Sequence, residues 1–192
     1  MIKVPLLTKT EANHTTEMLD VVTRSQQGDQ EAFHHLFRRY SKPVLSFIYN
    51  MIGEESLSEE LTQETFVRAY RNLKTLKDTS KFSSWLFGIA KNTVRESLKE
   101  SATNRYVELT EINLETLETP DKQMINSELN EAIKQAVLEL NEDWRIVFTL
   151  KMFQQKNYEE IAEITGWSIG KIKTDLHRAR LEMRNKLQNY LT

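Results

Sequence analysis

The sequence contains no cysteine, and only five glycines and three prolines occur among its 192 residues. The absence of cysteine excludes disulfide bonds, thiol redox sensing and a cysteine-ligated zinc within this chain. Few glycines and prolines favour helices over sheets, which need many turns. The sequence also lacks sustained alternation of apolar and polar residues with β-branched enrichment, so strands are not expected. The sequence therefore predicts an all-α fold.

Long apolar runs are missing as well. No run approaches the roughly 18–20 apolar residues of a membrane span, and the apolar start is too short for a signal peptide. We therefore expect a cytoplasmic protein. His34 and His35 are adjacent, so on a helix they point about 100° apart and cannot easily share a metal ion. Because the sequence also has no phosphate loop or nucleophile motif, we expect no metal, no cofactor and no enzyme activity.

Charge is nearly balanced, but it is unevenly distributed. The chain has 26 basic and 28 acidic residues, for a net charge of −2. Residues 54–64 carry glutamates and no basic residue, whereas residues 171–186 are mainly basic. A chain with an acidic middle and a basic end can approach a protein with one part and DNA with the other. The basic residues of the end are Lys171, Lys173, Arg178, Arg180, Arg184 and Lys186.

The apolar periodicity predicts two small helical domains joined by a flexible linker. We expect a polar tail at residues 1–15, a first domain at 16–100, the linker at 101–122 and a four-helix second domain at 123–192. In the first domain, Asp29 can cap a helix that ends at Gly53. Pro43 lies inside that helix and predicts a kink or brief break near Ser41 and Lys42. Further helices are expected at 56–73 and from Phe82 to about residue 100.

Residues 157–184 predict a helix-turn-helix. Asn157 and Glu160 can form a capping box at the start of the first helix. Gly166 stands where the chain leaves that helix, a place that favours positive φ, and Ser168 can cap the second helix. A basic helix presented in this way is a common means of reading the DNA major groove. The alternative is a plain helical hairpin with a solvated basic face.

The face of the second helix that would enter the groove can be predicted from the helical period. Arginine and lysine donate to guanine edges or phosphates, and threonine donates to either kind of partner. Asp175 could accept a hydrogen bond from cytosine or simply face solvent, so it is left outside the predicted set. Arg180 and Arg184 are better placed for phosphates or for a protein partner. The predicted set is Lys171, Lys173, Thr174, His177 and Arg178.

Several motifs together resemble a known family. LTQETFVRAYR at residues 61–71, FSSWLFGIAKN at 82–92, LNEDWR at 140–145 and the helix-turn-helix occur in the order and spacing of the extracytoplasmic-function group of bacterial sigma factors. The resemblance covers residues 25–188 and implies a subunit that directs RNA polymerase to promoters. It implies that the first domain binds the polymerase clamp and opens the minus-10 element. The second domain would grip the flap and read the minus-35 element.

The resemblance assigns clamp binding to the acidic helix of the first domain. A polar, acid-rich face beside an apolar stripe can dock on a basic helical hairpin, and its charges set association rate and register. The alternative is a solvated face, which is what most charge runs are. The implied core-binding residues are Glu59, Glu60, Thr62, Gln63, Glu64 and Arg68.

The resemblance assigns strand opening to the loop at residues 76–83 and to the helix that follows it. A base extruded from a duplex needs hydrogen bonds and contacts that replace its lost stacking. Trp85 and Phe87 are expected in the core rather than against bases. The residues after Asn92 depart from many relatives, which leaves contacts beyond that position open. The implied minus-10 residues are Asp78, Thr79, Ser80, Lys81, Lys91, Asn92 and Arg95.

Partners follow from the same resemblance. Core RNA polymerase, promoter DNA and an anti-sigma factor that wedges between the domains are implied, without membrane insertion of this chain. Two alternatives stay open: a stand-alone helix-turn-helix regulator with a ligand-sensing first domain, and a helical hydrolase or metal enzyme. The sequence shows no pocket signature for the first alternative and no ligand cluster or nucleophile for the second.

Overall fold

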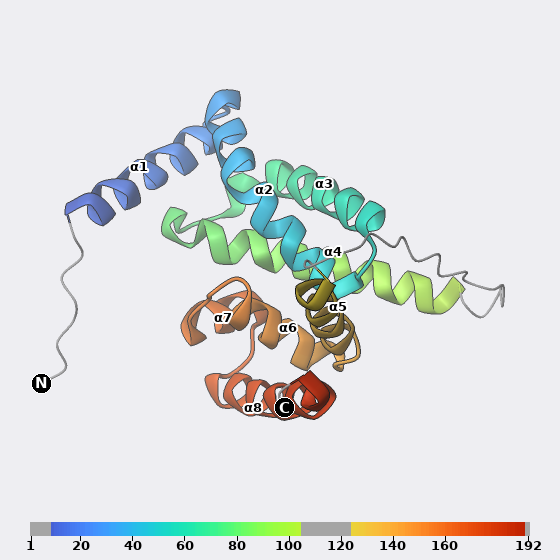
Figure 1. Ribbon diagram of the computed structural model, residues 1–192. Coiled ribbons are helices and arrows are strands. Elements are labelled where there is room, and N and C mark those ends of the chain that lie inside the picture. The colour runs from blue at the N-terminus through green and yellow to red at the C-terminus, as the bar shows by residue number, and fades with distance from the viewer. Residues whose placement is uncertain (1–8, 105–123, 191–192) are drawn as a thin grey trace, which may run out of the picture.

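The computed structural model describes residues 9–104 and 124–190, and these contain α-helices and short 3₁₀ turns but no strand, which confirms the all-α fold (Figure 1). The predicted linker falls mainly on residues 105–123, outside the described part. The α-helices are α1 (Lys9–Gln26), α2 (Gln30–Ile52), α3 (Glu55–Asn72), α4 (Phe82–Asn104), α5 (Met124–Leu138), α6 (Glu142–Met152), α7 (Tyr158–Thr165) and α8 (Ile169–Lys186). The 3₁₀ turns are η1 (Leu73–Thr75), η2 (Thr79–Lys81) and η3 (Gln188–Tyr190).

Two boundaries differ from the predicted ones. Helix α1 begins at Lys9, so the second half of the predicted tail is helical. Helix α4 continues to Asn104, into the region predicted as linker. Both extensions consist mostly of polar residues, which carry no apolar periodicity. The sequence therefore gave no sign that the backbone continues as a helix there.

Helix α2 forms the spine of the first domain. Asp29 caps it by accepting a hydrogen bond from the Ala32 N–H at 3.1 Å, and Gly53 ends it with φ of 83°. The helix is continuous through Pro43, so of the kink or brief break predicted near Ser41 and Lys42, the break does not occur. Proline removes one hydrogen bond, but apolar residues on both sides of it are fully buried and keep the two halves on one face.

The helix-turn-helix of the second domain has the predicted caps. Asn157 and Glu160 form the reciprocal capping box of α7, with both bonds at 2.8–2.9 Å. Gly166 adopts φ of 74°, and Ser168 caps α8 by accepting from the Lys171 N–H. Apolar side chains behind the turn are buried or half-buried, namely Ile161, Trp167, Ile172 and Leu176.

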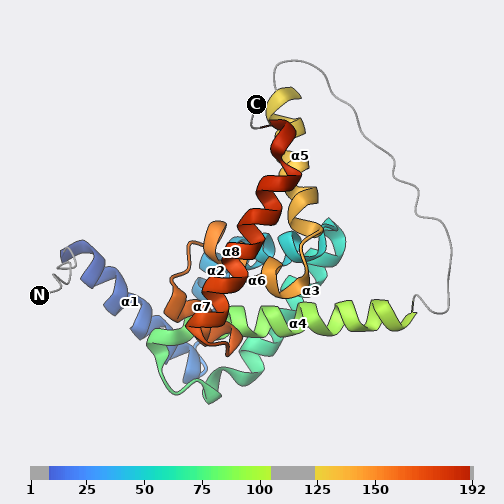
Figure 2. The ribbon, with the colours of Figure 1, turned by 90° about the horizontal axis from the view of Figure 1, so that it is seen from below.

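The two domains pack on each other. Helix α4 lies along α7, and α2 contacts α5 and α6. Figures 1 and 2 show α6 and α7 between the first domain and α8, which forms the outer layer of the second domain. Gly53 marks the close approach at one end of this contact, because a Cβ built there would stand 2.5 Å from Leu138 Cδ1 of α5.

No helix in the described ranges is both long and apolar enough to span a bilayer.

Candidate nucleic-acid and protein interfaces

The acidic face of α3 has an exposed edge made by Glu59, Glu60 and Gln63. Thr62, which the sequence placed in the same set, is only 7% exposed, and its hydroxyl donates to the Ser58 carbonyl at 2.7 Å. Thr62 therefore packs within the domain and offers little surface to a partner. Helical spacing in the sequence could not show that Thr62 is buried while Glu60 and Gln63 of the predicted set are exposed.

Glu64 and Arg68 are engaged within the first domain. Arg68 donates to Glu64 at 2.7 Å and to Glu96 of α4 at 2.5 Å. These two carboxylates raise the pKa of Arg68, with the hydrogen bond to Glu64 contributing most. The Arg68–Glu96 contact ties α3 to α4 beside the acidic face.

An apolar patch beside this face was not predicted from the sequence. Phe37, Val67 and Tyr70 are exposed, and with Gln63 they line a shallow hollow of about 500 Å³ between α2 and α3. Edge-to-face ring contacts hold the patch, with Phe33–Tyr70 centroids 4.9 Å apart. Helical spacing of aromatic residues is also typical of a buried stripe, so the sequence could not show that these side chains are exposed.

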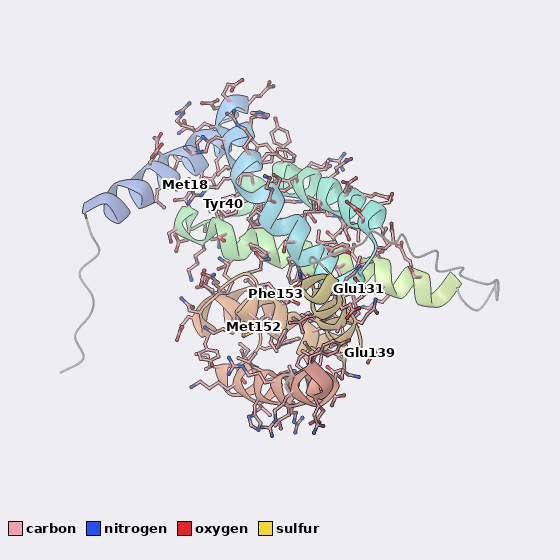
Figure 3. The ribbon with its side chains drawn as sticks, in the orientation of Figure 1. Met18, Tyr40, Glu131, Glu139, Met152 and Phe153 are labelled. Atoms are coloured by element: carbon pink, nitrogen blue, oxygen red, sulfur yellow. The ribbon has the colours of Figure 1, made fainter. Side chains whose placement is uncertain are left out.

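The loop before α4 is ordered by Asp78. Its Oδ1 accepts from the Ser80 backbone N–H at 3.0 Å and from the Ser80 hydroxyl at 2.5 Å. The Ser80 hydroxyl and N–H together lower the pKa of Asp78, which keeps its carboxylate charged. Thr79 and Ser80 line a hollow of about 200 Å³ together with Met18 and Tyr40. Figure 3 labels Met18 and Tyr40. The predicted loop residues therefore border a small polar-edged cavity.

The three predicted minus-10 cations all contact the second domain. Lys81 pairs with Glu163 of α7 at 2.7 Å, which raises the pKa of Lys81. Lys91 Nζ donates to the Ile164 carbonyl at 3.2 Å. Asn92, which follows Lys91 on α4, is exposed.

Arg95 donates from Nε to Glu142, and from Nη2 to Asp143 Oδ1 at 3.0 Å. Both carboxylates belong to the first turn of α6. The sequence gave no indication of these contacts, because they join residues 47 and 48 positions apart.

Lys91 is a buried cation, with 8% of the residue exposed. Burial lowers its pKa, and the charge of Arg95 lowers it further. The Ile164 carbonyl lies in the last turn of α7, where the helix dipole favours a cation and offsets part of the burial. The packed arrangement of the domains thus encloses a charged side chain.

The outer side of α8 is basic. Lys173, Thr174, His177 and Arg178 are exposed, and Figure 3 shows nitrogen-tipped side chains pointing away from the molecule along this helix. These four predicted residues therefore share one accessible face. Such a face can contact phosphates and base edges together.

Lys171 and Asp175 differ from the rest of the helix. Lys171 is half-buried, and its Nζ donates to Asp143 Oδ2 at 2.8 Å and to Asp175. Desolvation lowers the pKa of Lys171, but the bonds to the two carboxylates outweigh it and raise the pKa. Asp175 is only 6% exposed and accepts a hydrogen bond from Lys171, so it does not face solvent.

Phe87 belongs to the core as predicted, with its ring centroid 5.6 Å from that of Phe47. Trp85 is half-buried and packs against the core, and it also lines a hollow of about 310 Å³ with Ile89 and Asn92. Among the described residues, no group of histidines and acidic side chains is arranged to hold a metal ion.

Comparison with known families identifies two segments. Residues 36–103 match the family described as "Sigma-70 region 2", and residues 130–183 match "Sigma-70, region 4". The first match covers most of α2 to α4, and the second covers most of α5 to α8.

Individual proteins are similar over nearly the whole chain. The sequence is 31% identical to the ECF RNA polymerase sigma-E factor of Haemophilus influenzae, over 88% of this chain and 94% of the relative. It is 30% identical to the RNA polymerase sigma-H factor of Pseudomonas aeruginosa, over 89% and 94%. Among solved structures, CnrH in complex with the cytosolic domain of CnrY has a TM-score of 0.67 at 22% identity and covers 90% and 97% of the two chains, which shows a shared fold.

Proposed function

The chain belongs to the extracytoplasmic-function group of the sigma-70 family, and from this premise we propose that its two domains divide the binding of core polymerase and promoter DNA at the residues described above. As a sigma factor, it binds core RNA polymerase and directs promoter recognition, promoter opening and transcription initiation. It is a transcription initiation factor, and the polymerase supplies the chemistry, so we assign no enzyme activity to the chain. Its place of action is then the cytoplasm, beside the polymerase.

The domain division follows the family matches. We assign residues 16–100 to the polymerase clamp and the minus-10 element, and residues 123–192 to the flap and the minus-35 element. The matched segments, 36–103 and 130–183, lie on the two sides of the proposed linker and support this division.

Core binding is assigned to the exposed edge of α3. Glu59, Glu60 and Gln63 offer carboxylates and an amide to a basic partner. The apolar hollow beside Gln63 supplies area that can be buried in the same contact. Charge at the edge sets the association rate and the register, and the apolar area contributes most of the affinity.

Promoter opening is assigned to the loop at 78–81 and to the Asn92 side of α4. The cavity of about 200 Å³ beside Thr79 and Ser80 has hydroxyl groups at its edge that can bind a base edge. Lys81, Lys91 and Arg95 supply charge for phosphates once they are released from the second domain.

Recognition of the minus-35 element is assigned to the exposed face of α8, and this face is the single observation that best supports DNA binding. Ser168 and Gly166 fix the entry of the helix, and four of its residues are exposed, namely Lys173, Thr174, His177 and Arg178. A capped helix with its cations on an accessible face fits the major groove.

An anti-sigma factor is proposed as a further partner on the basis of family membership. Such a protein would bind between the domains or compete for their exposed faces. The contact of α4 with α7 is the surface that it would have to share or replace.

A transcription assay with the source organism's genomic DNA tests the function without a known promoter. Purified chain and core polymerase are incubated with the DNA, and the transcript starts are sequenced. New starts that share two upstream sequence elements are expected only when both proteins are present. Starts identical to those of core alone would overturn the proposal, whereas duplex binding without any requirement for core would favour a stand-alone regulator.

A further inference from the structure

An acidic pair at the start of α6 touches both DNA-binding elements assigned above. Asn141 caps α6, and the next two residues are Glu142 and Asp143. Acids are favoured in the first turn of a helix by its dipole, so the position alone suggests only a structural role. Their contacts indicate more, because their cationic partners come from different domains.

Asp143 joins the two domains through its two oxygens. Oδ1 accepts from Arg95 of α4 at 3.0 Å, and Oδ2 accepts from Lys171 of α8 at 2.8 Å. Glu142 accepts a second bond from Arg95. One carboxylate therefore neutralises a cation assigned to the minus-10 element and a cation in the first turn of the helix assigned to the minus-35 element.

Trp167 forms the aromatic wall of this cluster. Its ring centroid lies 4.1 Å from Lys171 Nζ and 5.7 Å from the Arg95 guanidinium carbon. The ring face attracts both cations and holds them beside the acids. Two cations gathered on one side of two carboxylates and an aromatic ring imitate the surroundings that DNA phosphates would offer.

The same interface also engages the remaining minus-10 cations. Lys81 pairs with Glu163, and Lys91 donates to the carbonyl of Ile164, both on α7. All three cations assigned to the minus-10 element thus contact the second domain. While α4 lies along α7, these cations are already paired, so DNA phosphates would have to compete for them.

We propose that Glu142 and Asp143 form an intramolecular phosphate mimic that keeps the free protein closed and masks its minus-10 cations until core polymerase separates the domains. This inference rests on the assignment of Lys81, Lys91 and Arg95 to DNA. The carboxylates compete with phosphates for the same donors, so DNA affinity is low before the domains part. The ion pairs are partly exposed, which makes the closed state weak enough to open on binding a larger partner.

The test removes the two charges while retaining the side-chain shapes. The Glu142→Gln/Asp143→Asn variant, called the mimic variant, is compared with wild type and with a control variant, Glu139→Gln/Glu182→Gln. The control variant loses the same charge from two acids that pair with Lys186 inside the second domain. Asp143→Asn alone is included in case the double variant folds poorly, and helicity is checked by circular dichroism for all variants.

Closure is measured with a carbodiimide, which joins a lysine to a carboxylate only when they are in contact. Cross-linked Lys81–Glu163 peptide, quantified by mass spectrometry, reports the closed state, because these groups are 2.7 Å apart across the interface. We expect the cross-link in wild type and control, a several-fold loss in the mimic variant, and its disappearance when wild type binds core. An unchanged yield in the mimic variant would overturn the proposal.

Masking is measured by binding to a fluorescent forked DNA of arbitrary sequence without core. Since partly exposed ion pairs are each worth about 1 kcal/mol or less, the mimic variant should bind about threefold to tenfold more tightly than the control. Equal affinity of the two variants would refute masking. If wild type with core initiates transcription while the Lys81–Glu163 cross-link persists, the sigma function stands and this inference fails. If transcription also fails, the function itself is wrong.

Discussion

At the scale of single residues, the conformations of two glycines can be compared directly. Gly53 and Gly166 both end helices with positive φ, at 83° and 74°. A Cβ at Gly166 meets nothing within 4 Å, whereas at Gly53 it would meet Leu138 of the other domain at 2.5 Å. Substituting alanine at the two positions therefore separates the free-energy cost of the backbone conformation from the cost of a steric clash.

We predict that Gly166→Ala lowers the free energy of unfolding by about 1 kcal/mol through its backbone alone. Gly53→Ala should cost more, since Leu138 must also move. Only Gly53→Ala should reduce the Lys81–Glu163 cross-link. Urea denaturation and the cross-linking assay measure the two effects, and equal results for both variants would show that the contact with Leu138 is unimportant.

A second residue-scale prediction concerns Glu60 on the exposed edge of α3. Glu60→Lys should slow association with core polymerase about threefold to tenfold at low salt, because edge charges steer encounter. Glu128→Lys, the same charge change at an exposed position of α5, serves as control. Stopped-flow fluorescence measures the rates at low and high salt. If both variants behave alike, α3 does not face the polymerase.

At the scale of elements, α8 presents two kinds of arginine. Arg178 belongs to the set assigned to base contacts, whereas Arg180 lies beside Met152, with its Nη2 3.7 Å from the methionine sulfur. Because good base contacts are worth about 1–3 kcal/mol of discrimination, Arg178→Ala should lose about tenfold or more in transcription from promoters that carry the upstream element. Promoters without that element should be far less affected.

Arg180→Ala is the comparison on the same helix. It should act similarly on all promoters, since phosphate or protein contacts carry no sequence information. Transcription from matched promoter pairs, with and without the upstream element, separates the two variants. A loss by Arg178→Ala that is equal on both promoter types would show that α8 does not read bases through this residue.

The helix-turn-helix could be predicted in detail because its signals are local. The capping box of Asn157 and Glu160 and the turn at Gly166 involve neighbouring residues, and all lie where the sequence placed them. Burial of Thr62 and the continuity of α2 through Pro43 could not be predicted, because both depend on what packs against the helix. Local interactions determine caps and turns, whereas tertiary contacts determine which side chains are buried and whether a helix continues through a proline.

At the scale of the whole molecule, the contact between the domains was outside the reach of the sequence. Asp143 joins residues that lie on different helices, and Arg145 Nη1 donates to the Met51 carbonyl at 2.6 Å across 94 positions. Such pairings have no periodic or motif signature. The sequence predicted two modules on a tether, whereas the structure shows them packed through α4 and α7.

Arg145 connects the ends of two helices in different domains. Besides the Met51 bond near the end of α2, its Nη2 donates to the Leu140 carbonyl after α5 at 2.9 Å. Burial lowers the pKa of this guanidinium. Replacing it would leave two carbonyls without these donors, at a cost of about 1–3 kcal/mol for each such group that stays buried.

We therefore predict that Arg145→Met uncouples the unfolding of the two domains. Wild type should unfold in one calorimetric transition because the domains share an interface, and the variant should show a broadened or split transition at lower temperature. Lys151→Met is the matched control on the same helix, since Lys151 Nζ donates to the Lys156 carbonyl within the second domain. That variant should retain a single transition. If Arg145→Met also unfolds in one sharp step with an unchanged midpoint, the interface does not couple the domains in solution.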